Sequence, residues 1–268
     1  MRYGMLLVPA GAAYALMVVA DRLLIGHFLG TEAVAFHAIA MAIGSLGLMM
    51  VAWFGLAFDP YLSGWIARGD QTNYLPKLQL LASSISVFFV LLSCLAAIWS
   101  APVIGFLYPE GYGPAAPVIP LIVFTAALTA LSRLGVATAV IAQTPKYHTV
   151  LYSCALVLNI FFGWWLIPLL GVMGAVISTV VAEMAILTSW IYLGRVRLKN
   201  LPIRWTAPLI TLFLGLGFVV IYIQQSNENS SLWMLLLLSA ALVGASLLLL
   251  YRAIGNDGLS KLYRYLRH

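Results

Sequence analysis

Residues 80–99 read LLASSISVFFVLLSCLAAIW, a stretch without a charged side chain. A helix rises about 1.5 Å per residue, so about 20 apolar residues cross the roughly 30 Å hydrocarbon core of a bilayer. Of the 268 residues in the chain, 63% are hydrophobic and 8% are charged, and the mean hydropathy is +1.02. Soluble domains carry about 25% charged residues. This composition excludes a soluble enzyme, a disordered regulator and a secreted disulfide scaffold, and it predicts an all-α, polytopic membrane helix bundle.

Apolar runs separated by turn residues predict about eight transmembrane helices. None of these runs has the alternating pattern of a β-barrel strand, and helices satisfy their own backbone polar groups inside lipid. Residues 59–68, DPYLSGWIAR, mix apolar and polar side chains and predict a short separate helix at the membrane interface. The expected spans lie at about 4–29, 33–58, 78–100, 117–142, 149–168, 172–194, 206–224 and 232–251.

Lysine and arginine are distributed unequally between the predicted loops. With eight spans, most of the 14 cations fall on one side of the membrane, and the loops on the opposite side contain none. Cytoplasmic loops are enriched in these residues, so we expect both termini to be cytoplasmic. The cations on the expected cytoplasmic side are Arg2, Arg68, Lys77, Lys146, Arg195, Arg197, Lys199, Arg204, Arg252, Lys261, Arg264 and Arg267.

Four ionisable residues lie well inside predicted spans: Asp21, Arg22, Arg133 and Glu183. Each would cost about 2.5–3.5 kcal/mol if it faced lipid near the bilayer centre, so they should face the bundle interior or a wet cavity. Neighbouring helical residues point about 100° apart, which makes Asp21 and Arg22 poor partners for each other.

Two interpretations of these charges remain open. In the first, Arg22 pairs with Glu183 and Asp21 pairs with Arg133, and the two buried ion pairs hold helices together. In the second, the charges line a polar cavity. The arginines then receive an anionic headgroup through bidentate hydrogen bonds, and the carboxylates bind a coupling proton or Na⁺.

The sequence contains no recognisable catalytic constellation, nucleotide-binding glycine loop or metal-ligand set, so we expect neither an enzyme nor a cofactor or metal. Both cysteines, Cys94 and Cys154, lie within apolar runs and are expected to be free thiols. The cations are spread over separate loops rather than gathered on one face, so a nucleic-acid partner is not expected.

Several motifs resemble the second half of a known transporter family. They are DRLLIGHFLG at 21–30, VAFHAIA at 34–40, LYPEGYGPAAPVIP at 107–120 and NIFFGWWLIPLLGVMGA at 159–175. The sequence is similar to polysaccharide (O-antigen type) flippases of the multidrug/oligosaccharidyl-lipid/polysaccharide exporter superfamily (MATE-like proteins). Residues 1–200 resemble the second six-helix lobe, and 201–268 resemble two additional transmembrane helices with a basic cytoplasmic tail.

The resemblance implies a function in lipopolysaccharide or related polysaccharide biosynthesis. Such a protein moves undecaprenyl-pyrophosphate-linked oligosaccharide across the bacterial cytoplasmic (inner) membrane by alternating access of two lobes. One lobe lacks its opposing wall, so a first-lobe partner or a homodimer is expected.

The same resemblance suggests a role for individual residues. Arg22 and Arg133 would face the cavity and bind the pyrophosphate, and Asp21 and Glu183 are candidates for ion coupling. The residues that match the family's structural signature are Asn159, Pro168, Gly171 and Gly174.

Three alternative functions remain open. A small-molecule or drug exporter lobe of the same superfamily would depend less on Arg22 and Arg133. A membrane transferase acting on polyprenyl phosphates would carry acidic or histidine clusters in its loops, whereas the loops here hold only scattered acids. An inactive truncated product or a non-transporting scaffold is also consistent with the length of the chain.

Overall fold

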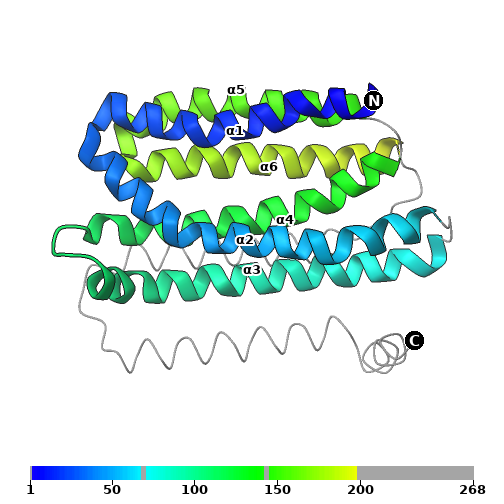
Figure 1. The fold of residues 1–268 in the computed structure, drawn as a ribbon, viewed down its shortest axis with the longest axis horizontal. Coiled ribbons are helices and arrows are strands. Elements are labelled where there is room, and N and C mark those ends of the chain that lie inside the picture. Colours follow the sequence, from blue (N-terminus) through cyan, green and yellow to red (C-terminus); the bar gives the residue numbers. More distant parts are fainter. Residues whose placement is uncertain (1, 68–70, 142–144, 198–268) are drawn as a thin grey trace.

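The computed structural model describes residues 2–67, 71–141 and 145–197, and all regular secondary structure in this part of the chain is helical. Six long helices and one short 3₁₀ helix follow one another in up-and-down order (Figure 1). Their bounds are α1 Arg2–Leu29, α2 Thr31–Ala67, α3 Gln71–Leu107, η1 Gly113–Val118, α4 Ile119–Ile141, α5 Pro145–Leu170 and α6 Val172–Arg197.

Six segments of the described residues are long and apolar enough to cross a membrane; five lie within one long helix each, and the fourth runs from η1 into α4. The segments are Val8–Leu29, Thr31–Phe58, Leu80–Leu107, Gly113–Leu134, Tyr147–Leu170 and Val172–Leu193. A multi-pass membrane bundle is therefore confirmed, and the first six predicted spans are found close to their expected positions. The last two predicted spans, 206–224 and 232–251, lie outside the described residues.

Two glycines form the tightest connections between helices. Gly30 joins α1 to α2 with a φ of +85°, and Gly171 joins α5 to α6 with a φ of +62°. These angles lie in the left-handed region, which a residue with a Cβ adopts only with strain. Each glycine lets the chain reverse within one residue, as the sequence predicted for the turn at 168–172.

One sequence-based expectation about the fold is wrong. Residues 59–67 do not form a separate interfacial helix; they continue α2 without interruption as far as Ala67. Pro60 lies inside this helix, where it removes one backbone hydrogen bond. Ending the helix there would leave several backbone groups without partners, whereas running through the proline loses only one.

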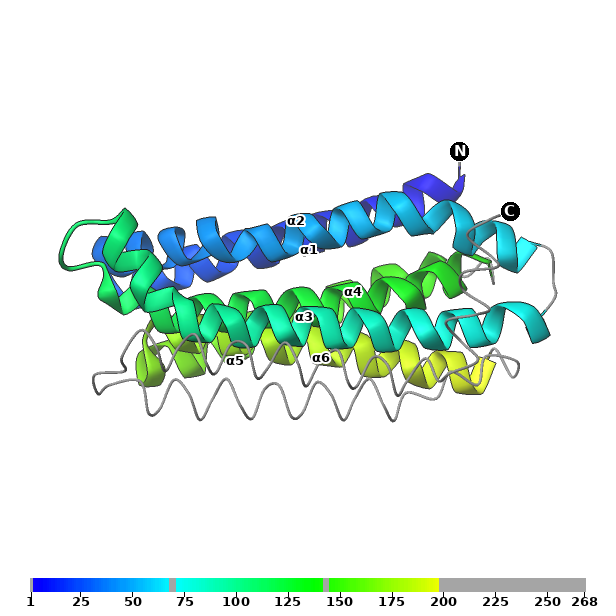
Figure 2. The same ribbon diagram turned by 90° about the horizontal axis from the view of Figure 1, so that it is seen from below.

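The helices pack as two groups of three. In one group α5 packs against both α1 and α6, and in the other α4 packs against both α2 and α3. The main junction between the groups is the contact of α4 with α6, and the views in Figures 1 and 2 agree with this arrangement. The span Gly113–Leu134 is the most buried of the six: 89% of its apolar 18-residue window lies inside the bundle, against 28% for the windows in α1, α2 and α5.

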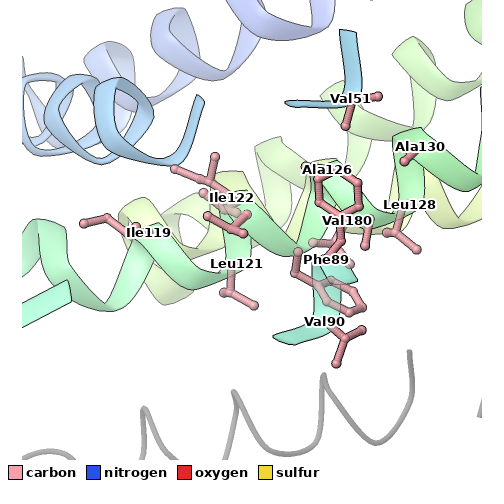
Figure 3. Packing of buried hydrophobic residues seen from close by; sticks show 14 of the residues in the cluster. Val51, Phe89, Val90, Ile119, Leu121, Ile122, Ala126, Leu128, Ala130 and Val180 are labelled. Carbon is pink, nitrogen blue, oxygen red and sulfur yellow. The ribbon is translucent and has the colours of Figure 1, made fainter. Parts of the chain in front are cut away.

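The apolar core follows the same division. The largest cluster is centred on α4, and Figure 3 shows the side chains of Val51 (α2), Phe89 (α3) and Val180 (α6) gathered around that helix. A second cluster, which includes Met17, Tyr152 and Trp190, joins α1, α5 and α6. Large apolar side chains also cover the outer surface of the bundle, as expected for helices that face lipid.

Candidate functional site: a buried acidic cavity

A cavity lies between α1, α2, α4 and α6, near the middle of the bundle. It offers about 50 Å³ to the centres of water molecules, which is enough for a few waters or a small cation. Two carboxylates contribute to its wall, so we call it the acid cavity. Its lining residues are Tyr14, Met17, Val18, Asp21, His37, Met41, Leu48, Ile122, Thr125, Thr129, Val176, Thr179 and Glu183.

Asp21 is held in the wall of the acid cavity by neutral hydrogen-bond donors. Its side chain is 7% exposed. Thr179 Oγ1 of α6 donates to Asp21 Oδ2 at 2.8 Å, and Asn159 Nδ2 of α5 donates to Asp21 Oδ1 at 3.2 Å. Because both donors are uncharged, this contact is a polar cluster rather than an ion pair.

Asn159 connects the helices around Asp21. Its amide nitrogen also lies 3.1 Å from Thr179 Oγ1 and 3.4 Å from Ser178 Oγ, and the side chain is completely buried. Its carbonyl oxygen, Oδ1, is buried and has no hydrogen-bond partner. An amide oxygen without a partner inside an apolar bundle is costly, so it leaves an acceptor available for a bound cation or water.

The sequence signature at 159–175 explains how α5 comes close enough to α6 for these contacts. A Cβ at Gly174 would collide with the backbone carbonyl of Leu166, so the two helices touch backbone to backbone at this point. Pro168 lies in the last turn of α5, where its missing N–H removes one helical hydrogen bond shortly before the Gly171 turn. These residues therefore position Asn159 beside Thr179.

Glu183 is the second acid of the cavity. It lies one helical turn beyond Thr179, on the same face of α6, and it is 2% exposed. The Thr129 hydroxyl of α4 hydrogen-bonds to its carboxyl group, whereas its Oε2 is buried without a partner. The hydroxyls of Tyr14 and Tyr152 are close enough to interact with it electrostatically.

Neither arginine is among the described residues that line the acid cavity, although Arg22 interacts electrostatically with His37, and Arg133 with Tyr14 and Tyr152. Arg22 is exposed on the outer surface of α1, about 10 Å from the Leu29 end at 1.5 Å per residue. Arg133 of α4 lies against Gly55 of α2, beside a second, smaller cavity of about 20 Å³ between α2, α3 and α4. The structure therefore brings Asp21, Asn159 and Glu183 to one site, and neither arginine contributes to the cavity wall.

Reasoning from the sequence missed several residues of this site. Thr179, Thr129, Tyr14 and Tyr152 were not singled out, although all of them contact or influence one of the two acids. Thr179 could have been found, because it precedes Glu183 by four residues and must share its helix face. The other three come from different helices, and no local pattern in the sequence indicates them.

No family model, curated protein or solved structure matches the chain.

Proposed function

We propose that this chain is one lobe of an ion-coupled exporter that moves undecaprenyl-pyrophosphate-linked oligosaccharide across the bacterial inner membrane. The observation that carries the proposal is the acid cavity, which places two buried carboxylates among apolar membrane spans. Ionisable groups in such a position are expensive, and in membrane proteins they mark ion and proton pathways. In this function Asp21 and Glu183 carry the coupling ion, a proton or Na⁺.

The exposed Arg22 supports an anionic substrate. Its guanidinium would cost about 2.5–3.5 kcal/mol if it faced lipid at this depth. Against a pyrophosphate, the same planar group donates paired hydrogen bonds and keeps its charge compensated. We therefore assign the outer surface of α1 around Arg22 to the substrate pathway, and Arg133 to a second contact deeper in the membrane.

The size of the acid cavity indicates that the substrate passes beside this lobe and not through it. A volume of about 50 Å³ holds a few waters, whereas ligand sites for small organic molecules have volumes of roughly 300–1,000 Å³. A pyrophosphate with attached sugars would then lie between this lobe and an opposing one. Either a first-lobe protein or a second copy of the chain would supply that wall.

The test of this function is complementation in the source bacterium. A strain without the gene receives the wild-type chain or an Arg22→Ala, Arg22→Lys or Leu23→Ala variant, and surface polysaccharide is measured by gel and lectin blotting. Leu23 is the matched control, because it is 68% exposed on the same helix and carries no charge. An antibody against the C-terminal tail reports the amount of protein in the membrane.

We expect Arg22→Ala to abolish surface polysaccharide at an unchanged protein level. Arg22→Lys should retain part of the activity, because lysine keeps the charge but not the bidentate geometry. Leu23→Ala should behave as wild type. Normal polysaccharide in the Arg22→Ala strain, or equal losses in the Arg22→Ala and Leu23→Ala strains, would contradict the proposed role.

A further inference from the structure

Polar side chains form a buried column that extends from the acid cavity toward one end of the bundle. At 1.5 Å per residue, Asp21 lies about 12 Å from the Leu29 end of α1, and Glu183 lies about 16 Å from the Val172 end of α6. Tyr152 and His148 follow on α5, about 27 Å and 33 Å from the Leu170 end. The last residue of α1, the last residue of α5 and the first residue of α6 lie at the same end of the bundle, next to the Gly30 and Gly171 turns (Figure 1). Asp21, Glu183, Tyr152 and His148 therefore follow one another with increasing distance from that end.

Ring contacts continue the column beyond Glu183. The ring centroids of His148 and Tyr152 are 4.5 Å apart, and those of Tyr14 and Tyr152 are 6.2 Å apart. Tyr152 is 9% exposed, and Nδ1 of His148 is buried without a hydrogen-bond partner. The column ends within one turn of the beginning of α5, where the His148 ring is partly exposed.

We infer that Glu183 is a mid-membrane proton site, and that Tyr152 and His148 connect it to the end of the bundle at which α5 begins. The geometric basis is the partnerless Oε2 of Glu183, which is buried in the wall of a cavity large enough for water. The inference deepens the proposed ion coupling and depends on it only for the direction in which protons flow.

The transfer leaves the number of protons unchanged at every step. Protonated Glu183 gives its proton through water in the acid cavity to the Tyr152 hydroxyl oxygen, while that hydroxyl gives its own proton to the His148 imidazole. The imidazolium then releases a proton to water at the end of the bundle. The Glu183 carboxylate is reloaded by a proton from water in the acid cavity.

The charged and titratable groups around Glu183 come from four helices. Tyr14 and Asp21 lie on α1, His37 on α2, Arg133 on α4, and Tyr152 and His148 on α5. Tyr14 and Tyr152 both interact with Glu183, but only Tyr152 contacts His148. Tyr14 lines the acid cavity and contacts Tyr152, so the control for Tyr152 is Tyr192, which is 65% exposed on α6 and lies outside the cavity lining.

Infrared spectroscopy of the full chain in lipid nanodiscs tests the inference without any transported substrate. A difference spectrum between acidic and alkaline buffer should contain the C=O stretching band of a protonated carboxyl group. Glu183→Gln should remove this band and Asp21→Asn should retain a band at the same position. A band that survives Glu183→Gln overturns the assignment.

Thr129→Val provides a second variant that keeps the carboxyl group. Because the Thr129 hydroxyl bonds to Glu183, its loss should move the Glu183 band to higher wavenumber. An unshifted band in this variant overturns the assignment of the band to Glu183, even where Glu183→Gln does not yield folded protein.

The exchange of the same band after transfer from H₂O to D₂O tests the path. Tyr152→Phe and His148→Phe should slow exchange at least about tenfold, because a positioned proton carrier typically accelerates transfer by 10²–10⁴-fold. Tyr192→Phe should leave the exchange rate unchanged. Equal slowing in the Tyr192→Phe and Tyr152→Phe variants overturns the path through α5. Neither spectroscopic result depends on export, so a failure of the Arg22 experiment is distinguishable from a failure here.

Discussion

Removing the Thr179 hydroxyl should destabilise the bundle by an amount that reports the charge on Asp21. Thr179→Val keeps the β-branched shape but deletes the 2.8 Å hydrogen bond to Asp21 Oδ2 and the acceptor for Asn159 at 3.1 Å. Hydrogen bonds to a charged group contribute about 1.5–3 kcal/mol, whereas those between neutral groups contribute about 0.5–1.5 kcal/mol. We therefore expect a loss of about 1.5–3 kcal/mol in the free energy of unfolding if Asp21 is ionised.

The measurement is equilibrium unfolding of the full chain in mixed detergent micelles, followed by tryptophan fluorescence. Thr179→Ser is the matched control, because it keeps the hydroxyl and removes only a methyl group. The same substitution in an Asp21→Asn background completes a double-mutant cycle, in which an ionised Asp21 should give a coupling energy of about 1 kcal/mol or more. A loss below about 0.5 kcal/mol for Thr179→Val, or an equal loss for Thr179→Ser, would refute this reasoning.

Two glycine substitutions give further predictions. Gly174→Ala should destabilise the chain by about 1–3 kcal/mol, because its Cβ meets the backbone of Leu166, which cannot move aside cheaply. Unfolding in detergent measures this, and Gly11→Ala, where no atom lies within 4 Å, should be neutral or stabilising. Gly55→Ala should leave stability within about 1 kcal/mol, since it meets only the end of the flexible Arg133 side chain, but it should lower surface polysaccharide by displacing that guanidinium. Wild-type polysaccharide in the Gly55→Ala strain would argue against a role for the position of Arg133.

The membrane-spanning helices could be predicted from the sequence because their signal is local. A window of about 20 apolar residues identifies a transmembrane helix, and glycine at positions 30 and 171 indicates where the chain reverses direction. The positions of the first six helices were therefore predicted closely. The interfacial helix was predicted wrongly because residues 59–67 have mixed composition. Composition does not reveal that the backbone of α2 continues through Pro60.

The acid cavity could be predicted only in part. Asp21 and Glu183 stood out because a charge in an apolar run is expensive wherever the helix lies. The groups that form hydrogen bonds to these two acids depend on how α1, α4, α5 and α6 are rotated and aligned against one another. The partners turned out to be the uncharged Asn159, Thr179 and Thr129, and nothing in a single helix indicates that these residues meet.

The division of the bundle into two three-helix groups has a mechanical consequence. The hydrogen bonds of Asp21 all lie within the group of α1, α5 and α6, whereas the bond between Glu183 and Thr129 crosses to the group of α2, α3 and α4. A hinge rotation about the contact of α4 with α6 would widen or close the acid cavity without disturbing Asp21. The hydrogen bond between Glu183 and Thr129 would then hold the two groups together. It would form or break according to whether the Glu183 carboxyl group carries a proton.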